Sequence, residues 1–178
     1  MTTEILLAGF GGQGILFSGK LLAYKALLEG KQVSWLPSYG PEMRGGTANC
    51  NVVLSDEPIG SPIVNHPDIL IAMNLPSLDK FEDSVIPGGA IFVDSTLIER
   101  KVKRDDVRVF YIPTTQMANE NGLNTLANMI MIGKVIRECD FTPYESIETA
   151  VKSVVSAKHA DLLQFNLKAL QLGYEYEG

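Results

Sequence analysis

Short apolar runs punctuate the first two thirds of the chain and predict the strands of a sheet. Several of these runs are continuously apolar, which is typical of parallel strands that are buried on both faces. The expected strands lie within residues 4–8, 32–37, 47–55, 68–73, 87–94 and 107–113. Between the first two, residues 15–29 carry apolar side chains at helical spacing, and Gly30 is expected to end that helix. This alternation predicts an α/β fold with a Rossmann-like, mostly parallel sheet flanked by helices.

Helical patterns dominate the rest of the chain. A short helix is expected at 76–81, and longer ones at 114–122, 123–137, from Thr142 onward and at 160–172. The 123–137 segment is apolar on nearly every side, so it is expected to lie in the core or at a subunit interface. Gly173 is expected to end the last helix, leaving the tail 174–178 loose or docked on a partner. Residues 1–178 are therefore predicted to form a single domain with C-terminal helices.

Composition excludes several function classes. The 178 residues are 46% apolar and 20% charged, with a formal net charge of −6, which argues against a non-specific nucleic-acid binder. The sequence lacks an apolar run of membrane-spanning length and a basic secretion signal, so we expect no membrane contact and a cytoplasmic location. Cys50 and Cys139 form no Cys-x-x-Cys pair, so we expect two free, buried thiols and no metal or cluster site.

A glycine-rich segment joins the first strand to the first helix. Gly9, Gly11 and Gly14 fit the pattern G-x-G-x-x-G in the strand–loop–helix setting of dinucleotide-binding sites. There the glycines admit a pyrophosphate, and the helix N-terminus offers free N–H groups to an anion. Alternatively, the glycines only permit a sharp turn and close packing. Ile15 follows Gly14 where a nucleotide-binding P-loop would have lysine, so that motif is absent.

The second strand argues against a standard dinucleotide. A nicotinamide or flavin site would need an acidic residue near the end of this strand to hold the ribose hydroxyls. Leu36, Pro37 and Ser38 stand there instead. The glycine loop is therefore expected to bind an anion or a backbone.

The stretch from Tyr39 to Cys50 follows at once, at the edge where ligands bind in open α/β sheets. Glycines surround Arg44, whose planar guanidinium suits a carboxylate or a phosphate. A simple turn with an ion pair between Glu42 and Arg44 is the alternative. Asn74 and Asp94 also follow apolar strands, so each either points into the same crevice or serves as a helix cap or turn residue.

The sequence shows no catalytic constellation. His66 has neither an acid nor a nucleophile beside it in the sequence, and a Ser-His-Asp, Cys-His or paired-carboxylate arrangement does not stand out. We therefore expect no catalytic residue and no metal ligand in this chain. A binding loop without catalytic groups is what a subunit that completes another chain's active site would carry.

Three motifs together carry a family resemblance. The segments 9–14, 39–48 and 65–68, with Asn74 closing the next strand, resemble the gamma subunit of 2-oxoacid:ferredoxin oxidoreductases over essentially the whole chain. The form Tyr-Gly-Pro-Glu-Met-Arg-Gly-Gly is more similar to the 2-oxoglutarate and branched-chain enzymes than to indolepyruvate ones.

The resemblance implies a place in the oxidative decarboxylation of a 2-oxoacid to its acyl-coenzyme A, with electrons passed to ferredoxin. Thiamine diphosphate, iron–sulfur clusters and coenzyme A then belong to the assembled enzyme, with alpha, beta and possibly delta subunits as partners, besides self-association. It implies that the loop facing the coenzyme A region consists of Gly9, Gly11, Gly12, Gln13 and Gly14. It implies that a substrate cavity or subunit contact includes Tyr39, Glu42, Met43, Arg44, Gly45, Gly46 and Asn74.

Two other functions stay open. The chain could be a free-standing Rossmann-like domain that binds a nucleotide or coenzyme A. It could also be a structural scaffold whose glycines serve packing alone.

Overall fold

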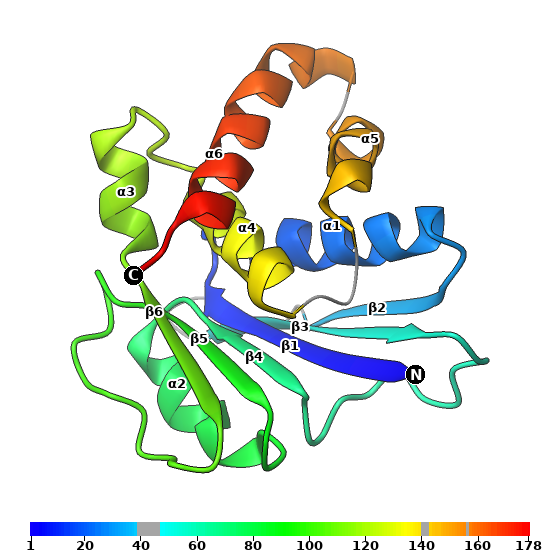
Figure 1. Ribbon diagram of the computed structural model, residues 1–178, viewed down its shortest axis with the longest axis vertical. Coiled ribbons are helices and arrows are strands. Elements are labelled where there is room, and N and C mark those ends of the chain that lie inside the picture. The colour runs from blue at the N-terminus through cyan, green and yellow to red at the C-terminus, as the bar shows by residue number, and fades with distance from the viewer. Residues whose placement is uncertain (39–46, 140–142, 156) are drawn as a thin grey trace.

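A mixed sheet organises the chain (Figure 1). The computed structural model describes residues 1–38, 47–139, 143–155 and 157–178, and within these ranges six strands form one sheet in the order β2-β3-β1-β4-β5-β6. The strands are β1 (Thr2–Phe10), β2 (Gln32–Ser38), β3 (Thr47–Ser55), β4 (Ile69–Ala72), β5 (Ala90–Asp94) and β6 (Arg108–Ile112). Strands β1, β4, β5 and β6 are successive neighbours in the sheet, and each pairs in parallel with the next. This arrangement confirms the predicted fold class.

The antiparallel strand β3 is the exception to the parallel pattern. It lies between β1 and β2 and pairs antiparallel with both. Residues 39–46 join β2 to β3, and this connection is shorter than the dozen or so residues that a parallel crossover needs. The chain therefore returns beside β2 in the opposite direction.

Burial along the strands explains their sequence patterns. Every residue of β4 and β5 is buried, as expected for the continuously apolar runs at the centre of the sheet. The edge strand β2 is partly exposed along its whole length. The helices are α1 (Ile15–Leu28), α2 (Leu75–Phe81), α3 (Thr114–Glu120), α4 (Ala127–Cys139), α5 (Ile147–Val154) and α6 (Leu163–Glu175). Three 3-10 turns complete the described elements: η2 (Glu82–Ser84), η3 (Tyr144–Ser146) and η4 (Ala157–Leu162).

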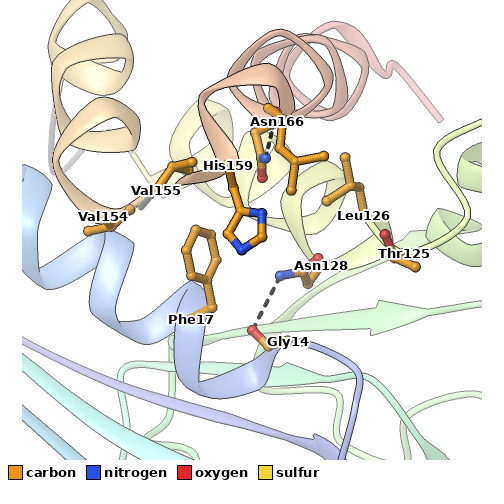
Figure 2. A pocket seen from close by; sticks show the side chains of 10 residues that line it. Gly14, Phe17, Thr125, Leu126, Asn128, Val154, Val155, His159 and Asn166 are labelled. Atoms are coloured by element: carbon orange, nitrogen blue, oxygen red, sulfur yellow. Dashed lines mark hydrogen bonds between the residues drawn. The ribbon is translucent and has the colours of Figure 1, made fainter. Parts of the chain in front are cut away.

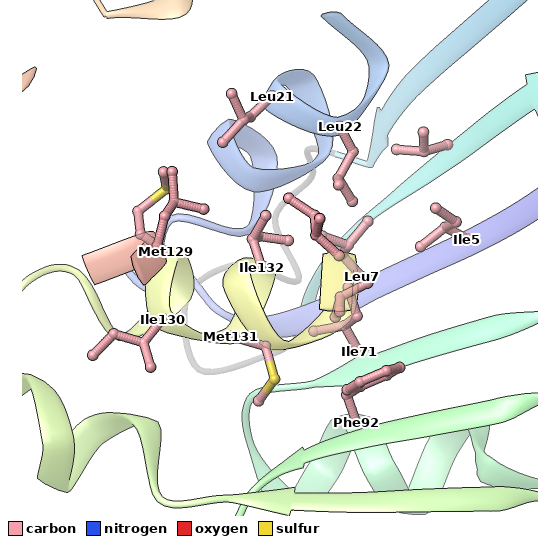
Figure 3. Close-up of a cluster of buried hydrophobic side chains, with 14 of the residues drawn as sticks. Ile5, Leu7, Leu21, Leu22, Ile71, Phe92, Met129, Ile130, Met131 and Ile132 are labelled. Atoms are coloured by element: carbon pink, nitrogen blue, oxygen red, sulfur yellow. The ribbon is translucent and has the colours of Figure 1, made fainter. Parts of the chain in front are cut away.

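The larger core lies between the sheet and helices α1 and α4 (Figure 3). Leu7, Ile71 and Phe92 rise from three neighbouring strands toward Leu22 of α1 and Ile132 of α4. Met129 and Met131 are completely buried in the same cluster, so this part of α4 is core rather than an exposed interface. Helix α2 covers the opposite face of the sheet over a smaller cluster that includes Leu6, Leu70 and Leu78.

Helix α4 starts later than its apolar pattern suggested, because residues 122–126 form turns. Gly122 adopts a left-handed conformation with φ 68°, and the amide of Leu123 returns to the carbonyl of Ala118 at 2.8 Å. The predicted N-cap Thr142 lies outside the described residues. The chain after it turns as η3 before α5 begins at Ile147.

The expectation that Gly173 ends the last helix is wrong. Helix α6 continues to Glu175, and Gly173 lies where α6 crosses α4. A β-carbon at 173 would come within 2.6 Å of the carbonyl carbon of Ile130, and one at Gly133 would lie 2.8 Å from the amide nitrogen of Tyr174. These glycines let two helix backbones touch, which is a packing role rather than a terminating one.

The C-terminal tail docks on the chain's own helix α4. Lys134 donates to the carbonyl of Tyr176 at 2.8 Å, and Arg137 donates to that of Tyr174 at 2.9 Å. Both contacts satisfy carbonyls at the end of α6, where a helix leaves such groups without intrahelical partners.

A buried lysine holds the segment after α4 against α1. Lys25 is completely buried and donates to Glu29 at 2.6 Å, to Ser146 at 2.9 Å and to the carbonyl of Pro143. Burial lowers the pKa of Lys25, and its bond to Glu29 opposes that shift. This network links helices that are distant in sequence.

Candidate functional site

All six strands of the described sheet have one end at the same edge. Ala8 of β1 lies beside Ala72 of β4, which lies beside Val93 of β5, so these parallel strands finish together. Phe10 pairs with Thr47 at the start of β3, whose Asn49 faces Ser38 at the end of β2. The glycine loop, Asn74 and the two residues that flank the stretch 39–46 (Ser38 and Thr47) therefore all lie at this carboxyl edge. Tyr39, Glu42, Met43, Arg44, Gly45 and Gly46 themselves lie outside the described residues.

The glycine loop turns sharply into α1. Gly12 and Gly14 have φ of 90° and 72°, a left-handed conformation that favours glycine. A β-carbon at Gly9 would come within 2.8 Å of the Ile15 Cδ1 and 3.0 Å of the Met73 β-carbon, so a larger residue here would make neighbouring side chains shift. Gly14 occupies the N-cap position, and within the described part of the chain no side chain caps the helix. The first amides of α1 are thus free of a side-chain partner and available to an anion or another acceptor.

Gln13 fastens this loop to the neighbouring strand. Its Oε1 accepts from the amide of Phe10 at 2.6 Å, and its Nε2 donates to the carbonyl of Met73 at 3.0 Å. Both polar ends of the side chain are therefore used within the chain. Gln13 positions the loop beside Asn74, which follows Met73 directly.

A cavity of about 310 Å³ adjoins the loop. Its lining consists of Phe10, Gly11, Gly12, Gly14, Ile15, Leu16, Phe17 and Ala48. These described lining residues carry no charge, so an anion bound here would depend on backbone N–H groups. The apolar walls suit the carbon skeleton of a ligand or an apolar side chain of another protein.

Asn74 caps a helix, and Asp94 holds the turn that follows β5. Asn74 is 1% exposed and its Oδ1 accepts from the amide of Ser77 at 2.9 Å, which caps α2. Asp94 is completely buried and accepts from the amide of Thr96 at 3.0 Å and from the hydroxyl of Thr115 at 2.6 Å. The sequence left open whether these side chains point into the crevice or serve as cap or turn residues. In the structure, hydrogen bonds of the cap or turn kind engage the side-chain oxygens of both residues. The Nδ2 of Asn74 is buried and has no hydrogen-bond partner among the described residues.

A second cavity, of about 380 Å³, opens beside the same loop and was not foreseen from the sequence (Figure 2). Asn128 of α4 donates to the carbonyl of Gly14 at 3.2 Å and to the hydroxyl of Ser18 at 3.0 Å. The ring of His159 faces this cavity together with that of Phe17. Because more than a hundred residues separate Asn128 from Gly14, only the fold brings them together.

The two cysteine thiols are the remaining potentially reactive groups considered for this site. Both cysteines are free; Cys50 is buried and Cys139 is half-buried, so only Cys50 meets the expectation of full burial. Burial raises the pKa of each thiol to about 12, which keeps it protonated and unreactive.

Among the described residues no group of acidic, histidine or cysteine side chains has the arrangement of a metal site. In the same ranges, each helix is too short or too polar to cross a membrane.

The glycine loop at the carboxyl edge of a mostly parallel sheet is characteristic of a Rossmann-like fold. Residues 4–176 match the protein family described as pyruvate ferredoxin/flavodoxin oxidoreductase, and the chain belongs to this family.

The relatives with similar sequences include proteins much longer than this chain and proteins of about its own length. Ketoisovalerate oxidoreductase subunit VorA of Methanothermobacter thermautotrophicus is 42% identical over 97% of this chain, but the match covers only 36% of VorA. The chain thus spans about a third of the first relatives it matches. The 2-oxoglutarate synthase subunit KorC of Methanocaldococcus jannaschii is 39% identical over 98% of this chain and 94% of its own length.

Solved structures share the fold. The keto/oxoacid ferredoxin oxidoreductase gamma subunit of Geobacter sulfurreducens aligns with a TM-score of 0.86 and 30% identity, over 98% of this chain and 95% of its own. A 2-oxoglutarate:ferredoxin oxidoreductase of Magnetococcus marinus, with 2-oxoglutarate, coenzyme A and succinyl-CoA bound, aligns with a TM-score of 0.87 and 25% identity. That alignment covers 97% of this chain and 30% of the other.

Proposed function

We propose that this chain is the gamma subunit of a 2-oxoacid:ferredoxin oxidoreductase, with 2-oxoglutarate or a branched-chain oxoacid as substrate. The observation that carries the proposal is the end-to-end match to a 2-oxoglutarate synthase subunit KorC and to a gamma subunit of known structure. The chain acts in the cytoplasm as one domain, residues 1–178. Its partners are the alpha, beta and possibly delta subunits and a further copy of itself, and ferredoxin meets the complex rather than this chain.

The residues of this chain fit a binding role in that reaction. Coenzyme A, when bound, supplies the thiol that receives the acyl group, while thiamine diphosphate and iron–sulfur clusters belong to the other subunits. The uncapped N-terminus of α1 offers donors for an anionic group of coenzyme A, and the left-handed Gly12, where a β-carbon would meet nothing within 4 Å, leaves room for it. Gly9, Gly11, Gly12 and Gly14 shape the loop, and Gln13 keeps it in place through Phe10 and Met73.

The stretch from Tyr39 to Gly46 forms the wall of the substrate cavity or a subunit contact in this proposal. Ser38 and Thr47, the described residues that flank it, lie at the carboxyl edge beside the glycine loop. Arg44→Ala in the assembled enzyme separates the two roles. If Arg44 contacts a ligand, the variant should assemble normally and show a raised KM for coenzyme A. If Arg44 serves only the scaffold of a subunit contact, the variant should fail to assemble.

The test of the proposal is reduction of a viologen dye that depends on both a 2-oxoacid and coenzyme A. The chain alone should be inactive, because the described residues hold no catalytic cluster, and activity should require the thiamine-binding subunits. Full activity of the purified chain without partners contradicts the proposal.

A free-standing domain that binds a nucleotide or coenzyme A is the second candidate. The observation in its favour is that the glycine loop, the uncapped helix and the adjoining cavity all lie within one chain. Calorimetry with the isolated chain discriminates the two. Micromolar or tighter binding of coenzyme A or ATP without partners favours this second function, and weak or absent binding favours the subunit.

A further inference from the structure

A side chain of α4 holds the first turn of α1 (Figure 2). Asn128 is 6% exposed, and its Nδ2 donates to the carbonyl of Gly14 at 3.2 Å and to the hydroxyl of Ser18 at 3.0 Å. The amide of Ser18 donates to the same Gly14 carbonyl at 3.0 Å. The carbonyl at the start of α1 thus accepts one bond from its own helix and one from α4. The turn is therefore fixed against α4 as well as within α1.

Close packing at Gly14 allows this contact to form. A β-carbon at Gly14 would lie 2.8 Å from the Cγ of Asn128, well inside contact distance. The left-handed φ of 72° already favours glycine at this position. The last glycine of the G-x-G-x-x-G motif therefore serves a second purpose, because it lets the amide of Asn128 reach the main chain where the loop becomes a helix.

The first amides of α1 depend on how this turn is held. The amide of Ser18 is the first in the helix that reaches a carbonyl of the turn. The amides of residues 15–17 therefore lack intrahelical partners, and all three residues line the loop cavity. Because the described lining of that cavity carries no charge, binding of an anion depends on N–H groups such as these. A rotation of the first turn would move all three donors together.

Stability alone does not explain an asparagine at position 128. Its Oδ1 is buried and has no hydrogen-bond partner among the described residues, which is a cost to folding. The four residues that follow in α4, 129–132, are apolar and completely buried. An apolar side chain at 128 would suit these surroundings and avoid that cost. The amide group is instead explained by the two bonds that its Nδ2 donates to the first turn of α1.

We propose that Asn128 is a positioning residue for coenzyme A, an inference that rests on the proposed function. Asn128 does not contact the ligand, because its Nδ2 is used by Gly14 and Ser18 and its Oδ1 is buried. It acts through the turn, by keeping the amides of residues 15–17 in place at the cavity where an anionic group of coenzyme A binds. Loss of the contact weakens the use of coenzyme A and spares the 2-oxoacid, which reacts on the cofactor of another subunit.

Asn128→Leu removes the donor and keeps a side chain of similar volume. Asn166→Leu is the matched control, because Asn166 is 5% exposed and also lines the His159 cavity. The Nδ2 of Asn166 donates to the carbonyl of Leu162 at 2.8 Å, at the start of its own helix, and not to the glycine loop. Both variants thus lose one buried asparagine donor, but only one of them releases the turn of α1.

Steady-state kinetics of the assembled enzyme measure the two substrates separately. Each variant is co-expressed with the subunits expected under the proposed function. We expect Asn128→Leu to raise the KM for coenzyme A about fivefold or more, since the loss of one hydrogen bond commonly changes an equilibrium by about this factor. Both kcat and the KM for the 2-oxoacid should stay within about twofold of wild type, as should all three constants in Asn166→Leu.

Ser18→Ala is a second variant that removes one of the two acceptors of Asn128. Alanine has a higher helix propensity than serine, so this substitution favours the fold of α1. We expect the KM for coenzyme A to rise about threefold, less than in Asn128→Leu, because the bond to Gly14 remains. This variant carries the kinetic test if thermal unfolding shows that Asn128→Leu does not fold.

Hydrogen–deuterium exchange of the isolated full-length chain tests the contact independently of function. Asn128→Leu should speed exchange of the Ser18 amide, because the Gly14 carbonyl that accepts from it is no longer fixed from α4. Asn166→Leu should leave that exchange unchanged. Unchanged exchange in Asn128→Leu overturns the inference, and so does faster exchange with an unchanged KM for coenzyme A.

The remaining outcomes separate this inference from the proposed function. An equal rise in the KM values of coenzyme A and the 2-oxoacid assigns Asn128 to general stability and overturns the inference alone. A complex whose coenzyme A-dependent activity does not need this chain overturns the proposed function and the inference with it.

Discussion

Gly173→Ala tests how closely α6 approaches α4. The substitution adds one methyl group where the two helices cross, within 2.6 Å of the carbonyl carbon and 3.1 Å of the α-carbon of Ile130. These are backbone atoms, so no rotamer change relieves the contact and the helices must move apart.

The expected cost follows from two opposing effects. Overpacking a close contact costs about 1–3 kcal/mol and sometimes more, and a backbone obstacle places Gly173→Ala at the upper end of that range. Replacing glycine by alanine inside a helix returns about 1 kcal/mol. We therefore expect a net loss of about 2 kcal/mol or more, which lowers the Tm of a chain of this size by roughly 4–8 °C.

Thermal unfolding followed by circular dichroism measures this loss. Gly60→Ala is the matched control, because a β-carbon at Gly60 meets nothing within 4 Å. Its Tm should stay within about 2 °C of wild type, since exposed substitutions of this kind are near neutral. If Gly173→Ala unfolds at or above the wild-type Tm, then Gly173 is not in tight contact and the described helix crossing is incorrect.

Two further substitutions and one labelling experiment test other parts of the fold. Lys25→Met should lower the urea-unfolding free energy by about 3–5 kcal/mol, because it removes the buried ammonium that pairs with the partly buried Glu29; a loss below about 1 kcal/mol contradicts the network. Neither Cys50 nor Cys139 should react with a thiol reagent at pH 8 until the protein is unfolded, because burial raises each pKa to about 12; rapid labelling of the native chain refutes this. Hydrogen bonds from Lys31 and the amino terminus lower the pKa of Asp56 to about 2, so its stabilising effect is present above its ordinary pKa of 3.8 and lost as pH falls toward 2. Asp56→Asn should therefore lose less stability than wild type between pH 5 and pH 2.5, and equal losses in urea titrations at the two pH values exclude this contribution.

The elements of the fold follow from the sequence where one local signal dominates. The buried runs of β4 and β5 and the loop from Gly9 to Gly14 are specified by neighbours in the chain. The role of Gly173 is not, because a glycine that ends a helix and one that admits a second helix look alike until α4 is placed beside α6.

The same limit applies to the candidate site. The sequence indicated that the glycine loop and Asn74 share an edge, and Gln13 joins the loop to the residue before Asn74. It gave no sign that Asn128 would reach Gly14, since an asparagine within an apolar helix carries no mark of its distant partner. Contacts between segments far apart in the chain depend on the packing of whole helices, which no short motif encodes.

Omission and re-addition of this chain test the central claim most directly. The thiamine-binding and iron–sulfur subunits expected under the proposed function are prepared without this chain, and reduction of ferredoxin is followed with a 2-oxoacid and coenzyme A. The account predicts that coenzyme A-dependent reduction falls by at least tenfold without the chain and returns when the purified chain is added. Undiminished reduction in its absence would show that the chain is not a working subunit of the enzyme.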